Sequence, residues 1–201
     1  MGASEILGVA ASVSLLSGWR LYLCVFATGM AMRFGWIAMP EHFHQLDMLA
    51  NPWVIGTAGV AAVAEFLADK VMWIDTAWDA VHTLIRPIGG ALLALAIVDP
   101  HDPAWQIVVL ILGGSGSLLT HSAKASTRAV VNVSPEPVSN LLLSTTEDVA
   151  TGGLLLIALA HPVAAIGVAA LLVTGAVVML LGLRRLVKAL MRRRTAKVPP
   201  A

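Results

Sequence analysis

The stretch PVAAIGVAALLVTGAVVMLLGL, residues 162–183, contains no charged side chain. As a helix it is long enough to cross the hydrocarbon core of a bilayer. The apolar run extends back to residue 149 with His161 as its only titratable group, and Pro162 lacks a backbone donor, so we expect two helices there. Further uncharged runs occupy residues 48–64 and 103–120. Together they predict an all-α protein whose helices span a membrane.

The composition also favours a membrane protein. Hydrophobic residues make up 58% of the 201 residues and charged residues 12%, and the mean hydropathy is +0.82. Soluble domains contain about 25% charged residues, so part of this surface must be solvated by lipid. These figures exclude a disordered chain and a nucleic-acid-binding module. The single cysteine, Cys24, excludes an internal disulfide.

We predict a polytopic transmembrane helix bundle in a single domain, residues 1–190, followed by a basic cytoplasmic tail, residues 191–201. Residues 4–16 are too short to span and end at the interrupting pair Ser17-Gly18. We expect them to form a separate half-helix, which is either re-entrant or interfacial. About six spanning helices are predicted, at residues 18–34, 52–69, 75–98, 104–121, 137–160 and 163–190.

The basic residues predict the orientation. Seven of the 13 lysines and arginines lie in residues 184–197, and the positive-inside rule therefore places the C-terminus in the cytoplasm. We expect this tail to contact anionic lipid. With an even number of spans, the same side of the membrane receives Arg20, Lys70, Lys124 and Arg128.

Two segments, 51–98 and 102–160, share a plan. Each begins with a proline and a tryptophan, and each later carries a Gly-Gly pair, Gly89-Gly90 or Gly152-Gly153. This pattern indicates a tandem hairpin repeat, as in transporters with parallel repeats. Two unrelated hairpins with similar packing needs would give the same pattern.

Ionisable side chains recur at helical spacing inside the predicted spans. A charged side chain at the bilayer centre costs on the order of 2.5–3.5 kcal/mol, so these groups should face the bundle interior and pair with one another. We expect Arg86 to pair with Glu147 or Asp148, and Lys70 or Lys124 to pair with Glu65 or Asp69. The candidate residues for binding a substrate or ion are Glu65, Asp69, Asp79, His82, Arg86, Lys124, Arg128, Asn140, Glu147 and Asp148.

The cluster suggests three kinds of function. A hydrated pocket facing the cytoplasm would suit transport of a small ion or polar solute, which we favour because no reaction-specific motif is present. A membrane-embedded enzyme acting on a lipid phosphate or phosphorylated isoprenoid is the alternative, with Arg86, Lys124 and Arg128 holding phosphate. A structural subunit, in which ion pairs only lock the helices, is the third.

No cofactor follows with certainty from the sequence. The carboxylates would suit Mg²⁺ or Mn²⁺, but none of their spacings is a specific metal motif. The expected partners are the lipid bilayer and a small ion, polar solute or lipid headgroup. No nucleic acid is expected, and a homo-oligomer remains open.

Two stretches, EFLADKVMWIDTAWDAVHTLIRPIGGALLA at 65–94 and THSAKASTRAVVNVSPEPVSNLLLSTTEDV at 120–149, resemble a bacterial membrane family known as domain of unknown function 4126. The resemblance covers about residues 18–160. It implies a multi-pass protein of the bacterial inner membrane and carries no established activity. The polar family positions matched here are Glu65, Asp69, Lys70, Asp75, Trp78, Asp79, His82, Arg86, Pro87, Lys124, Asn132, Ser134, Pro135, Glu136, Pro137, Ser139, Asn140, Glu147 and Asp148.

Overall fold

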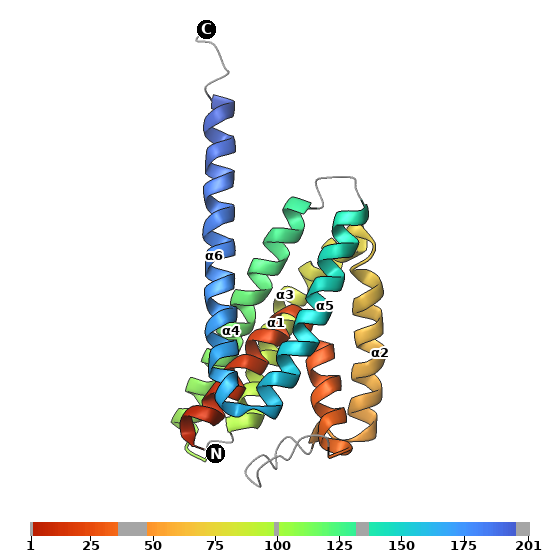
Figure 1. The fold of residues 1–201 in the computed structure, drawn as a ribbon, viewed down its shortest axis with the longest axis vertical. Helices are drawn as coiled ribbons and strands as arrows, with labels where there is room; N and C mark the ends of the chain where they lie inside the picture. The colour runs from red at the N-terminus through yellow and green to blue at the C-terminus, as the bar shows by residue number, and fades with distance from the viewer. Residues whose placement is uncertain (1, 36–47, 99–100, 132–136, 196–201) are drawn as a thin grey trace.

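The computed structural model describes residues 2–35, 48–98, 101–131 and 137–195, and over these residues it is all-helical (Figure 1). The predicted polytopic helical bundle is confirmed. Within the described ranges there are six helices: α1 (Ala3–Arg33), α2 (Pro52–Ala68), α3 (Met72–Val98), α4 (Pro103–Val131), α5 (Pro137–Ala160) and α6 (Pro162–Thr195). By length and composition, α1, α3, α4, α5 and α6 can cross a membrane, and α2 is a shorter apolar helix of 17 residues.

Prolines and side-chain caps set where the helices begin. Pro52, Pro103, Pro137 and Pro162 each occupy the first position of a helix, where a missing N–H costs little. Before α2, the Asn51 side chain accepts a hydrogen bond from the backbone N–H of Trp53 at 2.9 Å. These starts match the predicted boundaries closely.

The N-terminal region differs from the prediction. Residues 4–16 and 18–34 belong to one helix, α1, which is broken at Arg20 (φ −143°, ψ 78°) and not at Ser17-Gly18. The two halves of α1 point back toward the same end of the bundle, so that Arg20 is the apex of a bend (Figure 1). The sequence predicted a break in this region, and the structure places it two residues after Gly18.

Contacts along α1 confirm this course. Ser12 donates a hydrogen bond to the carbonyl of Ala165, near the start of α6. Arg33, at the other end of α1, donates to the carbonyl of Ala50, which precedes α2. Both neighbours lie at the end of the bundle where α2 and α6 begin, whereas Arg20 reaches residues at the far end of α2. Helix α1 therefore reverses direction at Arg20, with both of its ends at the same end of the bundle (Figure 1).

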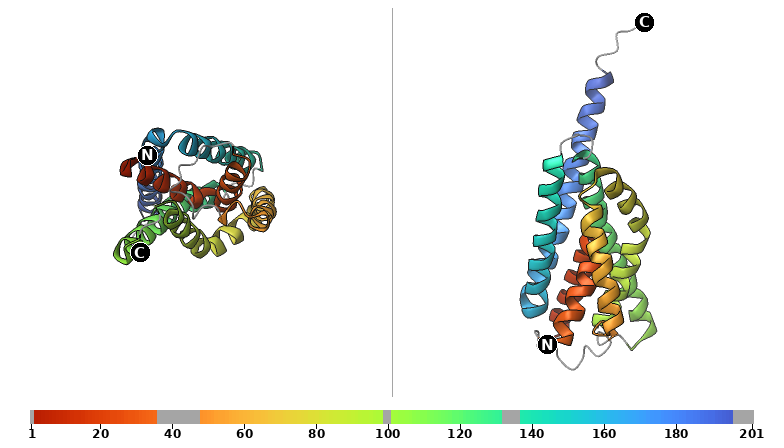
Figure 2. Two further views of the ribbon diagram at one scale, coloured as in Figure 1. Left: turned by 90° about the horizontal axis from the view of Figure 1, so that it is seen from below. Right: turned by 90° about the vertical axis from the view of Figure 1, so that its right-hand side faces the viewer.

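Helices α2 to α6 run between the two ends of the bundle, and α1 is packed among them (Figure 2). The first half of α1 approaches α4 closely, because a side chain at Gly18 would meet Thr120 and the backbone of Ser117. Gly90 of α3 is similarly close to Ser117, whereas Gly152 and Gly153 have open space around them. The two Gly-Gly pairs thus have different surroundings, and the repeat stays a prediction.

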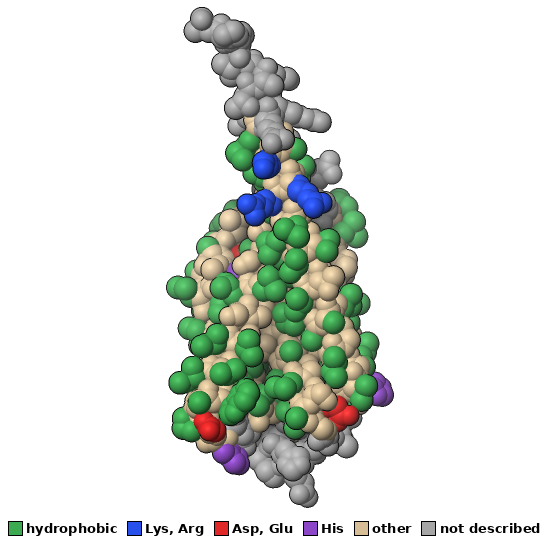
Figure 3. All heavy atoms as spheres, turned by 90° about the vertical axis from the view of Figure 1, so that its left-hand side faces the viewer, with side chains coloured by type: hydrophobic (Ala, Val, Ile, Leu, Met, Phe, Trp, Pro, Cys, Tyr) green, Lys and Arg blue, Asp and Glu red, His purple; other side chains and the backbone are tan. Residues whose placement is uncertain are grey.

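The outer surface is apolar over most of its length, with basic side chains toward the far end of α6 and acidic and histidine side chains at the opposite end (Figure 3). Large side chains such as Leu142, Ile157 and Val178 are exposed on this surface. A surface of this kind is suited to contact with lipid.

Candidate functional site: a buried ionic network

Charged side chains from α1 to α5 and the turn after α2 meet inside the bundle. We call this set the ionic network. Most of its members are fully buried, and all are joined by ion pairs. Its members are Arg20, Glu65, Asp69, Lys70, Asp75, Asp79, Arg86, Lys124, Arg128, Glu147 and Asp148.

Arg86 of α3 is the centre of one part. Its Nη2 lies 2.6 Å from Oε1 of Glu65 on α2, and its Nη1 lies 3.0 Å from Oδ1 of Asp79 on α3. The same Nη1 lies 2.6 Å from Nδ1 of His121 on α4. Four side chains from three helices therefore meet at one guanidinium, and we call Glu65, Asp79, Arg86 and His121 the Arg86 cluster.

Asp69 is the centre of the other part. Its Oδ2 pairs with Arg20 and lies 3.4 Å from both Lys124 Nζ and Arg128 Nη2. Arg128 also pairs with Glu147 at 2.6 Å, and with Asp75 at 3.0 Å. Because Asp69 follows the last residue of α2, the end of that helix is fixed to α1 and α4 through a single carboxylate.

The break in α1 joins the two parts. The carbonyl of Gly18 accepts from Arg86 at 3.4 Å, and the carbonyl of Trp19 accepts from Lys124 at 3.1 Å. A helix that ends leaves its last carbonyls without partners. Here cationic side chains satisfy two of them, so the break and the network stabilise each other.

Hydrogen-bond roles define the state of His121. Arg86 can only donate, so Nδ1 of His121 accepts. Thr83 Oγ1 donates to the carbonyl of Asp79 at 2.9 Å and lies 3.0 Å from His121 Nε2, which therefore donates to the hydroxyl. His121 is a neutral ring with its proton on Nε2.

His82 is hydrogen-bonded through both ring nitrogens. Its Nδ1 donates to the carbonyl of Trp78 at 2.7 Å, and its Nε2 lies 3.0 Å from the Tyr22 hydroxyl, which can donate or accept. The ring stacks on Trp78, with 4.5 Å between the centroids. His82 therefore links α1 to α3 beside the Arg86 cluster.

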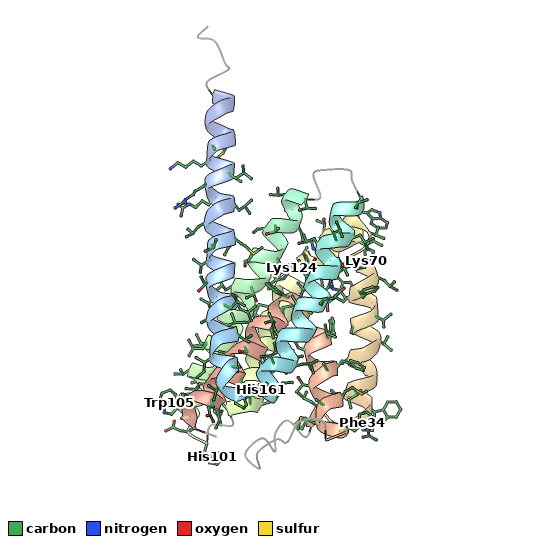
Figure 4. All side chains as sticks on the ribbon, viewed as in Figure 1. Phe34, Lys70, His101, Trp105, Lys124 and His161 are labelled. Carbon is green, nitrogen blue, oxygen red and sulfur yellow. The ribbon has the colours of Figure 1, made fainter. Side chains whose placement is uncertain are left out.

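The network reaches the surface of the bundle at one edge. Lys70 and Asp148 pair at 3.6 Å, and their side chains are 19% and 21% exposed. Lys70 also donates to Ser144 Oγ at 2.5 Å. Figure 4 shows Lys70 and Lys124 in the same half of the bundle, away from Phe34 and His101. This edge is the most accessible part of the network in the described structure.

The structure corrects one predicted pairing and confirms another. Arg86 pairs with Glu65 and Asp79 and not with Glu147 or Asp148, because Glu65 lies on the helix joined to α3 by a short turn. Lys124 pairs with Asp69, as predicted.

Several participants were not among the sequence candidates. Arg20 was expected only at the cytoplasmic side of the membrane, and the predicted interruption at Ser17-Gly18 did not indicate that the break carries Arg20 inward. His121, Ser144 and Tyr22 were not selected as site residues, although His121 shares a helix face with Lys124 and Arg128. The side chain of Asn140 and residues 132–136, with Asn132, Ser134, Pro135 and Glu136, lie outside the described part.

The carboxylates do not fit a metal centre as they stand. Among the described residues, no three His, Cys, Asp or Glu side chains are arranged to hold a metal ion. The six acids of the network each face a cation instead. We therefore derive no step through Mg²⁺ or Mn²⁺.

A cavity of about 700 Å³ lies beside the network, between the second half of α1, α2 and α3. Its lining is mostly apolar and includes Leu21, Val25, Trp53 and Leu92. Tyr22, which also lines it, is hydrogen-bonded through its hydroxyl to His82. The cavity thus adjoins the polar interior through one side chain.

Fold and site together define a multi-pass membrane protein with a buried ionic network. A family model described as domain of unknown function (DUF4126) matches residues 7–181, and the chain belongs to this family. The match confirms the resemblance seen in the sequence and extends beyond residues 18–160 at both ends. Comparison with curated proteins and with solved structures gives no match.

Proposed function

We propose that this protein transports a small ion or polar solute across a membrane, and that the ionic network is the part that rearranges. The observation that carries the proposal is the break in helix α1, which reverses direction at Arg20 and brings this residue into the network. Broken helices whose free backbone groups meet charges in the interior are typical of transporters. The sequence candidates that belong to the network are its proposed binding residues.

The pairings also favour transport over a purely structural role. Asp69 Oδ2 is shared by Arg20, Lys124 and Arg128 among the described residues. Replacing buried ion pairs by apolar residues is often neutral or stabilising, so such a network is a weak means of locking helices. Shared carboxylates permit exchange of partners, which a transport cycle requires.

We propose that the end with Lys70 and the C-terminal segment of α6 faces the cytoplasm, in a bacterial inner membrane. The exposed arginines Arg184 and Arg185 of α6 lie toward that end, as the positive-inside rule requires. Because α1 turns back, the start of α1 lies at the opposite end from the end of α6 (Figure 1). Residues 1–190 form one transmembrane domain in this proposal.

Flux into proteoliposomes tests the proposal. The purified protein is reconstituted with dyes for pH, Na⁺ and K⁺ inside the vesicles, and uptake of radiolabelled phosphate and amino acids is followed in parallel. We expect flux above that of empty vesicles, and at least a tenfold loss in Arg20→Gln. Arg184→Gln, on the exposed surface of α6, is the matched control and should keep its flux. Absence of any flux, or equal flux in Arg20→Gln, would contradict the proposal.

The cavity beside Tyr22 favours one alternative, an enzyme that acts on a lipid phosphate whose chain occupies the cavity. Against it, each cation of the network already faces a carboxylate, which a phosphate would have to displace. Release of phosphate from a polyprenyl phosphate in the same vesicles, without flux, would favour the enzyme.

A further inference from the structure

The two parts of the ionic network differ in net charge. Among the described residues, the Asp69 part holds four cations and four carboxylates, whereas the Arg86 cluster holds one cation and two carboxylates. The Arg86 cluster therefore carries a net charge of −1 when its acids are ionised. Arg86 and Glu65 are 0% and 1% exposed as side chains, so water does not screen that charge.

The neighbours do not supply the missing positive charge. His121 is neutral because its Nδ1 accepts from Arg86, and the hydrogen bonds of His82 go to the carbonyl of Trp78 and the hydroxyl of Tyr22 and not to an acid of the cluster. Two side chains of α1, Tyr22 and Cys24, interact electrostatically with Glu65, and neither of them is cationic. The nearby Lys124 of α4 is engaged with Asp69 and Trp19.

Two buried atoms of the Arg86 cluster, Arg86 Nε and Glu65 Oε2, have no hydrogen-bond partner among the described residues, and of these only the oxygen can take up a proton. Oε1 of Glu65 accepts from Arg86, whereas its buried Oε2 has no hydrogen-bond partner among the described residues. A buried carboxylate oxygen without a donor is costly. Protonation of this oxygen would remove the charge while Oε1 keeps its bond to Arg86.

We propose that the Arg86 cluster binds one exchangeable proton, carried on Glu65, and that this proton is the ion whose binding and release accompany transport. The inference rests on the proposed function. A metal cation would need several oxygen ligands, and no group of three His, Cys, Asp or Glu side chains among the described residues is arranged to hold one. Because Glu65 is buried, exchange of the proton with water requires a rearrangement of the side chains or helices around it.

Infrared spectroscopy of the full chain in lipid tests the inference, since a protonated carboxyl has a carbonyl stretch that a carboxylate lacks. At neutral pH, in sodium-free buffer, we expect a band equal to one carboxyl per chain, which disappears in alkali. Glu65→Gln and Asp79→Asn should each abolish the band, because one carboxylate then faces one guanidinium. The controls Glu5→Gln and Asp102→Asn, outside the network, should keep it.

If neither variant folds, wild-type protein containing ¹³C-labelled glutamate shows which type of acid carries the proton. The carbonyl band must shift in frequency on labelling if a glutamate carries it. A missing band, a band that persists in Glu65→Gln, or a band that does not shift on labelling would overturn the inference. So would a carboxylate vibration that responds to added Na⁺ in place of protons. If the infrared band is present but the vesicles show no flux, the proton site is supported and the transport function is rejected. If the vesicles show flux but the band is missing, only the proton site is rejected.

Discussion

At the scale of single residues, Arg86 shows how the interior tolerates charge. Its guanidinium faces two carboxylates and a neutral histidine, and its backbone carbonyl accepts from Ser117 at 2.9 Å. Removing one partner from such a group leaves an uncompensated buried charge, which costs more than the pair itself contributes. Removal of one partner of a buried ion pair should therefore destabilise the protein more than removal of both partners.

Arg86→Gln tests this dependence. We expect a loss of about 3–5 kcal/mol in the free energy of unfolding, because Glu65 and Asp79 lose their cation. The double variant Arg86→Gln with Asp79→Asn should recover part of that loss, because the proposed proton already neutralises Glu65. Unfolding in detergent by heat or denaturant measures both. Equal stability of Arg86→Gln and of the surface variant Arg184→Gln would contradict the expectation.

Asp69 should be the most sensitive acid of its part of the network. It pairs with Arg20, Lys124 and Arg128 and is fully buried, whereas Asp148 is 21% exposed. Asp69→Asn should therefore destabilise the protein by at least about 2 kcal/mol more than Asp148→Asn. The difference in unfolding free energy between the two variants is the measurement, and the opposite order would refute the assignment.

At the scale of elements, the sequence predicts where helices begin better than how they bend. Pro52, Pro103, Pro137 and Pro162 mark helix starts because a ring without an N–H is tolerated there. Arg20 gives no such signal, since its non-helical backbone is held by tertiary contacts to Asp69 and Asp148. A local pattern does not contain those contacts.

The packing of α1 against α4 depends on Gly18. A Cβ at this position would lie 2.0 Å from Thr120 Oγ1 and 2.2 Å from the carbonyl oxygen of Ser117. Gly18→Ala should therefore push the helices apart and cost about 1–3 kcal/mol. Gly152→Ala, at a position with open space, is the matched control and should leave stability nearly unchanged. Thermal unfolding compares the two, and a tolerated Gly18→Ala would count against the close approach.

The sequence predicted many of the residues of the candidate site, but only some of the ion pairs that they form. Helical spacing places Asp79 and Arg86 on one face of α3, because seven residues make about two turns, and they do pair. Spacing identifies a face without identifying what lies opposite, so Arg86 was assigned to the wrong carboxylates, Glu147 or Asp148. The choice between partners depends on how helices pack, which one sequence does not specify.

At the scale of the whole molecule, composition was enough to predict a helical membrane bundle. Apolar runs such as residues 162–183 have no alternative to a helix in lipid, because every backbone group must be satisfied internally. The course of α1 was predicted only in part, since a separate half-helix was expected at residues 4–16 but residues 18–34 were expected to cross the membrane as a span of their own. Its reversal changes which side of the membrane each end should occupy.

Labelling of single cysteines tests the reversal of α1, on which the site and the proposed function depend. In a Cys24→Ser background, Ser4→Cys and Phe34→Cys lie at the two ends of α1, and Lys188→Cys lies on the far segment of α6. A membrane-impermeant thiol reagent applied to one side of sealed vesicles should label positions 4 and 34 from the same side, and position 188 only from the other. Labelling of positions 4 and 34 from opposite sides would show that α1 spans the membrane and would contradict the account.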